Sequence, residues 1–279
     1  MFYRDLKMDI NSNELHLLEW PGSKDAIICI HGLTCNGHWW EKLAERLSPE
    51  YKVISYDLPG RGDSSIPTQS YGYKEHSDDI KTIIDKLNLN KVTLIGHSLG
   101  ANIACYFAYQ NPNRIEKIVL IDGGMDPPRS VLDALKPSID RLGNTYSSFS
   151  EYLKYIRRMP FFADWSDYWE KYLYYDVVHC NNGNVMNKMS KEYLFEEIMS
   201  LSKTKINDYH LKITIPELII WAPKGLLLPN VFVLTREKGE DIANIKIDNH
   251  FVAIKDTNHF SIMINDQTIL EIEHYLKRL

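Results

Sequence analysis

The sequence lacks any apolar run close to the roughly 20 residues that a membrane-spanning helix needs. Its first ten residues alternate charged and apolar side chains, so they lack the apolar stretch of a secretory signal. Basic residues are also few, because 32 Lys and Arg stand against 37 Asp and Glu and form no basic stripe. We therefore expect a cytoplasmic protein with no membrane or nucleic-acid partner.

Cysteine is scarce and has no CxxC spacing. The four cysteines are Cys29, Cys35, Cys105 and Cys180. This pattern favours reduced structural thiols over disulfides or a metal site. The sequence also lacks a GxGxxG fingerprint and a Walker loop, so we expect no cofactor and no bound metal.

The residues that are present predict an α/β fold. The composition, 44% hydrophobic and 25% charged, is that of a folded globular chain. Short apolar runs alternate with amphipathic segments, which indicates a mostly parallel sheet flanked by helices. The predicted strands are residues 26–30, 52–56, 91–95, 117–121, 215–221 and 250–254, with an antiparallel edge strand at 15–19. The predicted helices are residues 39–47, 73–87, 98–110 and 265–279.

The strand pattern is interrupted between residues 126 and 212, a stretch that reads as several short helices. An insertion of this length is too long for a plain connection, so we predict a helical cap on a core made of residues 1–125 and 213–279. Twelve of residues 146–175 are aromatic. Trp165 and Trp169 lie four apart, so they share a helix face. We expect this pair to line the substrate pocket, although most of the aromatic residues can equally form the core of the cap.

The segment Gly96-His97-Ser98-Leu99-Gly100 matches the G-x-S-x-G motif between a predicted strand and a predicted helix. In such a turn, glycine at 96 and 100 prevents clashes between backbone segments. The turn presents Ser98 at the carboxyl end of the sheet, where α/β sheets bind ligands. Ser98 is therefore the candidate nucleophile.

A serine hydroxyl needs a base and a group that stabilises the oxyanion. His259 is the candidate base, because it follows the last predicted strand and so lies at the same sheet edge as Ser98. The backbone N–H of Leu99, directly after the serine, is one candidate oxyanion donor. The second is the N–H of Leu33, in the loop after the strand at 26–30, where Gly32 permits a close approach of the backbone.

Four segments, HGLT, DLPGRGDSS, GHSLGAN and DTNHF, occur in the order found in the α/β-hydrolase superfamily. The chain resembles its capped, esterase-like members over nearly its whole length. In that family the triad acid usually follows the strand at 215–221, but Gly225 stands at that place here. Some relatives carry the acid at the end of the preceding core strand, which implies Asp122. Asp126 and Asp256 remain as alternatives.

The resemblance implies a serine hydrolase that cleaves carboxylic esters or lactones through an acyl-enzyme, with Ser98, His259 and Asp122 as the triad. A small hydrophobic ester or lactone is the expected substrate. Two other interpretations stay open. The same triad can hydrolyse amides, thioesters or carbon–carbon bonds, and the fold can serve as a ligand receptor that retains a hydrolase site.

Overall fold

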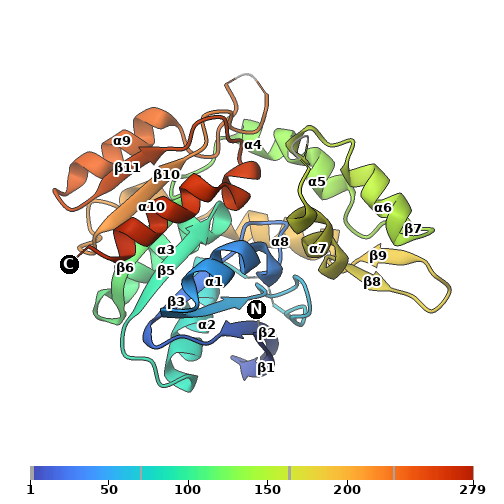
Figure 1. Cartoon of the computed structure of the whole chain (residues 1–279), viewed down its shortest axis with the longest axis horizontal. Coiled ribbons are helices and arrows are strands. Elements are labelled where there is room, and N and C mark those ends of the chain that lie inside the picture. The colour runs from blue at the N-terminus through green and yellow to red at the C-terminus, as the bar shows by residue number, and fades with distance from the viewer. Residues whose placement is uncertain (1–2, 70, 163–164, 229, 279) are drawn as a thin grey trace.

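The fold centres on an eight-stranded sheet, seen in a computed structural model that describes residues 3–69, 71–162, 165–228 and 230–278 (Figure 1). The strand order is β1-β2-β4-β3-β5-β6-β10-β11. The strands are β1 (Arg4–Ile10), β2 (Asn13–Trp20), β3 (Lys24–Ile30), β4 (Tyr51–Tyr56), β5 (Val92–His97), β6 (Ile115–Ile121), β10 (Glu217–Trp221) and β11 (His250–Ala253). β2 is antiparallel to both neighbours, and the pairs from β4 to β11 are parallel.

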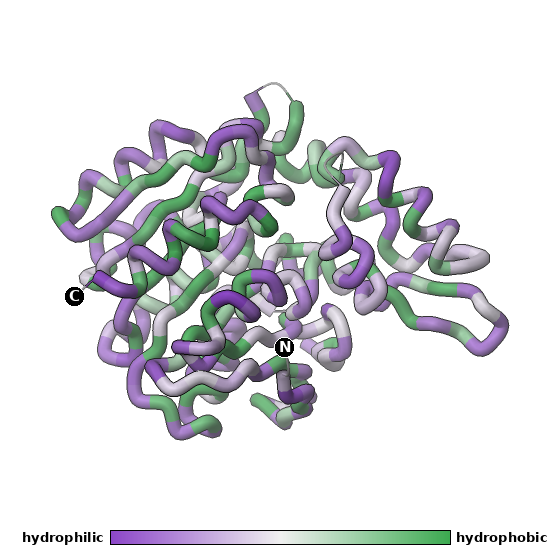
Figure 2. Tube along the Cα trace, viewed as in Figure 1, coloured by the Kyte–Doolittle hydropathy of each residue, from purple (hydrophilic) through white to green (hydrophobic). Residues whose placement is uncertain are grey.

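Helices cover both faces of the sheet, as the buried apolar strands require. One face packs against α1 (Glu41–Leu47) and α10 (Asp266–Leu276). The other packs against α2 (Tyr73–Lys86), α3 (Leu99–Gln110) and α9 (Arg236–Ile245). Side chains alternate between the two cores along the inner strands, as in β3, and Figure 2 shows the hydrophobic residues concentrated along these central strands.

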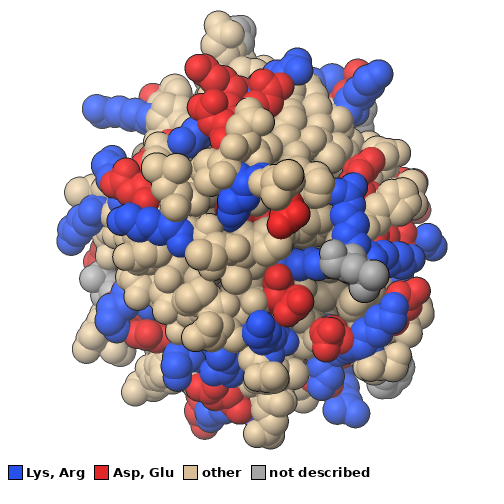
Figure 3. Space-filling model, turned by 90° about the vertical axis from the view of Figure 1, so that its left-hand side faces the viewer, with Lys and Arg blue, Asp and Glu red and all other residues tan. Residues whose placement is uncertain are grey.

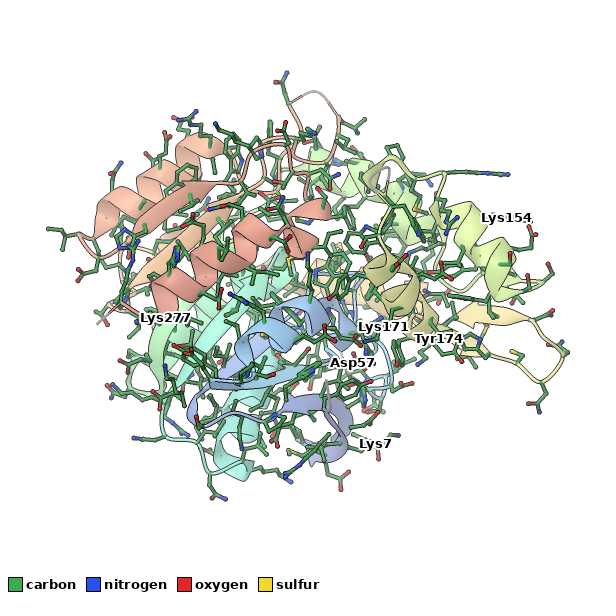
Figure 4. All side chains as sticks on the ribbon, in the orientation of Figure 1. Lys7, Asp57, Lys154, Lys171, Tyr174 and Lys277 are labelled. Carbon is green, nitrogen blue, oxygen red and sulfur yellow. The ribbon has the colours of Figure 1, made fainter. Side chains whose placement is uncertain are left out.

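The segment between β6 and β10, which we call the cap segment (residues 126–212), lies beyond the end of the sheet (Figure 1). Its helices are α4 (Arg129–Ala134), α5 (Lys136–Asp140), α6 (Phe149–Ile156), α7 (Asp167–Tyr175) and α8 (Lys191–Leu201). The cap segment also contains the short 3-10 helices η3 (Pro160–Phe162) and η4 (Ile206–Asp208). The core contains η1 (Gly37–Trp40), η2 (Pro112–Arg114) and η5 (Ser261–Ile264). Lys171 of α7, labelled in Figure 4, forms an ion pair with Glu41 of α1 that ties the cap segment to the core.

Two expectations need correction. Residues 15–19 belong to β2, which is an inner strand rather than an edge, because β1 pairs with its outer side. The alternation of charged and apolar residues at the N-terminus is the half-buried pattern of β1. The cap segment also contains a small antiparallel sheet of β7 (Thr145–Tyr146), β9 (Val185–Asn187) and β8 (Val177–His179), whose strands are too short to leave a sequence pattern.

The exterior carries both signs of charge. Lys and Arg side chains are interspersed with Asp and Glu over the face in Figure 3. Within the described residues, no helix has the length and apolar character needed to cross a membrane. All four cysteines have free thiols, and only Cys180 is exposed.

Trp169 lies in the core between the cap segment and η1, with a 1% exposed surface. Its ring is 5.1 Å from that of Trp39 and 5.1 Å from that of Phe162. Trp165, by contrast, is only partly buried, and the Arg157 guanidinium lies 4.2 Å over its ring.

We therefore expect Trp169→Ala to lower the free energy of unfolding by about 3–5 kcal/mol, since it leaves a large cavity in a packed core. Trp165→Ala is the matched control and should cost about 1 kcal/mol, the value of a cation–π contact at an exposed site. Urea denaturation measures both variants. Equal losses would contradict this placement of Trp169.

Candidate active site

Ser98 occupies a strained turn between β5 and α3, with φ 56° and ψ −119°. A non-glycine residue in such a conformation costs on the order of 1–3 kcal/mol and is typical of functional sites. The flanking glycines make the turn possible. A Cβ at Gly96 would lie 2.3 Å from the Gly100 carbonyl oxygen, and a Cβ at Gly100 would lie 2.0 Å from the Ile30 oxygen.

Asp122 lies beside Ser98 because of the register between their strands. His97 of β5 pairs with Ile121 of β6, and each is followed directly by a site residue. The Ser98 N–H donates to the Ile121 carbonyl at 3.0 Å. The two turns are in contact, since a Cβ at Gly123 would lie 2.5 Å from the backbone carbonyl oxygen of Ser98. The register of two parallel strands thus places the predicted nucleophile and the predicted acid side by side.

His259 reaches the same sheet edge and faces Asp122. Its Nδ1 lies 2.7 Å from Asp122 Oδ2, so the ring donates a hydrogen bond to the carboxylate there. The other carboxylate oxygen accepts the Ala222 N–H at 3.2 Å. Both groups are buried, with the His259 side chain 3% and the Asp122 side chain 1% exposed. A donating Nδ1–H leaves Nε2 of the neutral imidazole free to accept a proton.

The backbone of His259 is fixed on both sides. Its N–H donates to the Gly225 carbonyl at 2.9 Å, and its carbonyl accepts from His97 Nε2 at 2.9 Å. His97 in turn accepts from Trp39 Nε1 at 3.2 Å through its Nδ1. Burial, followed by the neighbouring His259, lowers the pKa of His97 well below its ordinary value. His97 is therefore a neutral support of the His259 loop.

The structure separates Asp122 from the alternative acids. The Asp126 carboxylate accepts the Ile206 N–H at 2.9 Å in the cap segment. Asp256 is exposed. Gly225 adopts φ 49°, and a Cβ there would lie 2.5 Å from the Val231 oxygen, so this position suits glycine. Asp122 is the carboxylate that faces His259.

The loop after β3 brings the Leu33 backbone to the serine. A Cβ at Gly32 would lie 3.2 Å from His97 Nδ1 and 3.3 Å from the Ser98 Cβ, so glycine eases a close approach of this loop to the serine. His31 Nδ1 donates to the Gly32 carbonyl at 2.8 Å, and its Nε2 accepts the Leu58 N–H at 2.9 Å. Burial lowers the pKa of His31 to about 4, so this bridge is neutral and rigid.

A cavity of about 200 Å³ contains Ser98, Leu33 and Leu99 in its wall. Cap-segment residues supply much of its apolar surface. They are Val131, Leu135, Ile198 and Leu201. Trp165 and Trp169, the predicted pocket residues, are not part of this wall among the described residues. That expectation needs correction: Trp165 precedes α7 and lies under Arg157, so the pair does not share a helix face, and Trp169 of α7 contacts Trp39 of η1.

The comparisons with known proteins agree with this architecture. The family model described as "alpha/beta hydrolase fold" matches residues 25–266. This chain belongs to the alpha/beta hydrolase family. A structure of E-2-(acetamidomethylene)succinate hydrolase superposes on this chain with a TM-score of 0.86, at 20% identity, over 99% of this chain and 100% of the other.

The sequence relatives of this chain are distant. A 2-hydroxy-6-oxononadienedioate/2-hydroxy-6-oxononatrienedioate hydrolase of Cupriavidus pinatubonensis is 25% identical over 90% of this chain and 89% of its own length. An uncharacterized protein of Mycobacterium tuberculosis is 34% identical over 37% of this chain and 30% of its own length. The chain spans about a third of the length of four of the curated relatives that it matches.

Two residues that support the site were not among the sequence predictions. Asn102, the last residue of GHSLGAN, lines the cavity and accepts the Gly124 N–H at 2.8 Å. Arg61, within DLPGRGDSS, donates from Nε to the Leu33 carbonyl at 3.2 Å. Both lie in the motifs that carry the family resemblance, which is the signal that could have found them.

Arg61 is fully buried, and its counter-charge comes from the cap segment. The guanidinium forms a two-pronged ion pair with Glu197 of α8, which is also fully buried. His76 Nε2 donates to the same carboxylate at 2.9 Å. Although burial opposes it, the charge of Arg61 and the bond from His76 lower the pKa of Glu197 to about 2. This ion pair connects α8 to the Leu33 loop.

Two groups in the described part of the chain have ligand-type side chains close enough for a metal ion: Cys105, His210 and Glu217, and His16, Asp57 and Asp63. Both histidines already use both ring nitrogens. His210 bonds Glu217 and the Gly124 carbonyl, and His16 bonds Asp57 and Asp5. Burial opposes protonation, yet Cys105 and Glu217 raise the pKa of His210 to about 10. We assign both groups as structural ion pairs.

We expect Glu197→Gln to lower the free energy of unfolding by about 3–5 kcal/mol at pH 7, since it leaves the Arg61 guanidinium buried without a counter-charge. Glu196→Gln, at the neighbouring exposed position, is the control and should change it by less than about 0.5 kcal/mol.

The same variant should change the pH dependence of stability. Because the folded pKa of Glu197 is lowered to about 2, its stabilisation is present above the unfolded pKa of about 4.3 and is lost as the pH falls toward 2. Urea unfolding of wild type and variant between pH 6 and pH 3 measures this. The wild type should lose more stability than Glu197→Gln over that range, and parallel curves would contradict the assignment.

Proposed function

We propose that this chain is a serine hydrolase of carboxylic esters or lactones. Ser98 is the nucleophile, His259 the general base and Asp122 the acid that orients it. The backbone N–H groups of Leu33 and Leu99 form the oxyanion hole. One observation carries the proposal: the hydrogen bond of 2.7 Å from His259 Nδ1 to Asp122, next to the strained turn of Ser98.

The reaction proceeds in two halves. Ser98 Oγ attacks the substrate carbonyl while His259 Nε2 takes its proton, and the oxyanion is held by two N–H groups. His259 then gives the proton to the leaving alcohol, which leaves an acyl-enzyme. Water, deprotonated by His259, attacks the acyl carbonyl and releases Ser98. The Asp122 carboxylate stabilises the imidazolium in each half.

Two features support an ester or lactone as the substrate. The candidate nucleophile is serine. The dehalogenases and epoxide hydrolases that this architecture resembles use aspartate at the same turn. The cavity wall next to Ser98 is mainly apolar, which suits an uncharged acyl or alkyl group at the reacting end. Leu33 and Leu99 line the cavity together with Ser98, so a carbonyl bound there lies near their backbone groups.

The bond that is cleaved is tested with a matched panel. The panel contains p-nitrophenyl esters, the corresponding p-nitroanilides and thioesters, and a 2-hydroxy-6-oxodienoate for carbon–carbon cleavage. We expect sustained turnover that is fastest on the esters. Faster turnover of the dienoate would replace the ester assignment. A single acylation event without further product release would instead favour the receptor interpretation.

Ser98→Ala should abolish labelling by a fluorophosphonate and reduce kcat on esters by about 10⁴-fold or more, since only binding and the oxyanion hole remain. Gel fluorescence and steady-state kinetics give the two readouts, and circular dichroism checks the fold. Ser64→Ala, a buried serine of the DLPGRGDSS loop, is a control that should keep its labelling. Labelling of Ser98→Ala at the wild-type level would sink the nucleophile assignment.

Asp122→Asn should reduce kcat by about 10³- to 10⁴-fold at neutral pH, because the amide keeps the shape but cannot stabilise the imidazolium. Asp126→Asn and Asp256→Asn are the controls and should stay within a few-fold of wild type. If Asp122→Asn is fully active while either control loses activity, the acid is the residue of that control.

A further inference from the structure

The cavity at Ser98 also contains two basic side chains. Arg129, at the start of α4, and Lys205, between α8 and η4, both form part of its wall. Both residues are exposed to solvent, which places them at the opening of the cavity. They come from opposite ends of the cap segment and meet at the same opening.

Neither charge has an ion-pair partner in the described part of the chain. Among the described residues, no carboxylate lies within ion-pair distance of Arg129 or Lys205. Other exposed basic residues of the cap segment do have such partners, as in the pairs Lys136–Asp140 and Lys154–Glu151. The two unpaired cations are therefore available to a ligand.

The only acidic residue among the described residues of the cavity wall is Asp126, and its carboxylate is already used. One oxygen accepts the Ile206 N–H at 2.9 Å, and the other is 3.5 Å from the Asn207 N–H. These bonds hold it against η4. The wall thus carries two cations without an ion-pair partner and one carboxylate that is hydrogen-bonded to the backbone of η4. Its other residues, which include Ser98, are mainly apolar.

We propose that the substrate is a carboxylic ester whose acyl chain ends in a carboxylate, which Arg129 and Lys205 bind at the cavity opening. The inference rests on the proposed ester hydrolysis and adds its substrate class: the half-ester of a dicarboxylic acid. The guanidinium of Arg129 can hold a carboxylate through two parallel hydrogen bonds, and Lys205 adds a second charge. The apolar residues that line the same cavity suit the methylene chain.

The test compares mono-p-nitrophenyl esters of adipic, pimelic and suberic acids with esters of the same length that end in a carboxamide. Shorter half-esters are avoided, because their carboxylate attacks the ester intramolecularly. We expect kcat/KM to favour the carboxylate over the carboxamide by about tenfold at low ionic strength, the value of one hydrogen bond to a charged group. The preference should shrink in 0.5 M salt, as expected for ~4–5 Å screening lengths.

Charge removal identifies the residues. Arg129→Gln and Lys205→Gln should each lower the ratio of the two kcat/KM values, and the double variant should bring it close to one. The ratio is the readout because a general loss of activity or stability cancels in it. Arg158→Gln and Lys203→Gln are matched controls, since both residues are exposed and neither lines the cavity. They should keep the wild-type ratio.

Each other outcome overturns a specific statement. Hydrolysis of both esters without preference, or a preference that survives in Arg129→Gln and Lys205→Gln, overturns the carboxylate site and leaves the proposed hydrolysis intact. Hydrolysis of neither ester, together with failure of Ser98 to react with a fluorophosphonate, overturns the proposed function and the inference with it.

Discussion

The parallel pairing of β5 with β6 is the constraint on which the site depends. Once His97 is in register with Ile121, the next residues along the two strands are Ser98 and Asp122. The hydrogen bond of 3.0 Å from the Ser98 N–H to the Ile121 carbonyl fixes this register. A shift of one residue would turn the side chains at the strand ends to the other face. The position of the carboxylate is thus set by the same hydrogen bonds that form the sheet.

A second constraint is electrostatic and joins the cap segment to the core. Arg61 and Glu197 are buried together, so each needs the other to offset the cost of leaving water. Arg61 also donates to the Leu33 carbonyl, and Leu33 supplies a proposed oxyanion donor. A movement of α8 would therefore be felt at the Leu33 loop. The helix α8 also supplies Ile198 and Leu201 to the cavity wall. The same helix therefore supports both the cavity and the Leu33 loop.

The alpha/beta hydrolase family uses one sheet to carry many reactions, so the fold alone does not determine the substrate. What distinguishes this chain is how its sheet edge is furnished. Gly225 occupies the place where the acid usually stands in the family, and its carbonyl accepts the His259 N–H instead. The cap segment then determines the rest of the cavity, through apolar residues near Ser98 and two cations at the opening.

The sequence by itself determined the order of the strands and of the site motifs along the chain. Glycines at 96 and 100 required a tight strand-to-helix turn, and continuous apolar runs required a sheet covered on both faces. Those are local effects of backbone sterics and burial, so motif and periodicity reveal them. Only the tertiary structure decided that Asp122 rather than Asp126 or Asp256 faces His259, because that depends on register and side-chain direction. It also placed Trp169 in the core against Trp39 and left Trp165 outside α7, since a spacing of four residues shows neither where a helix begins nor what its face contacts.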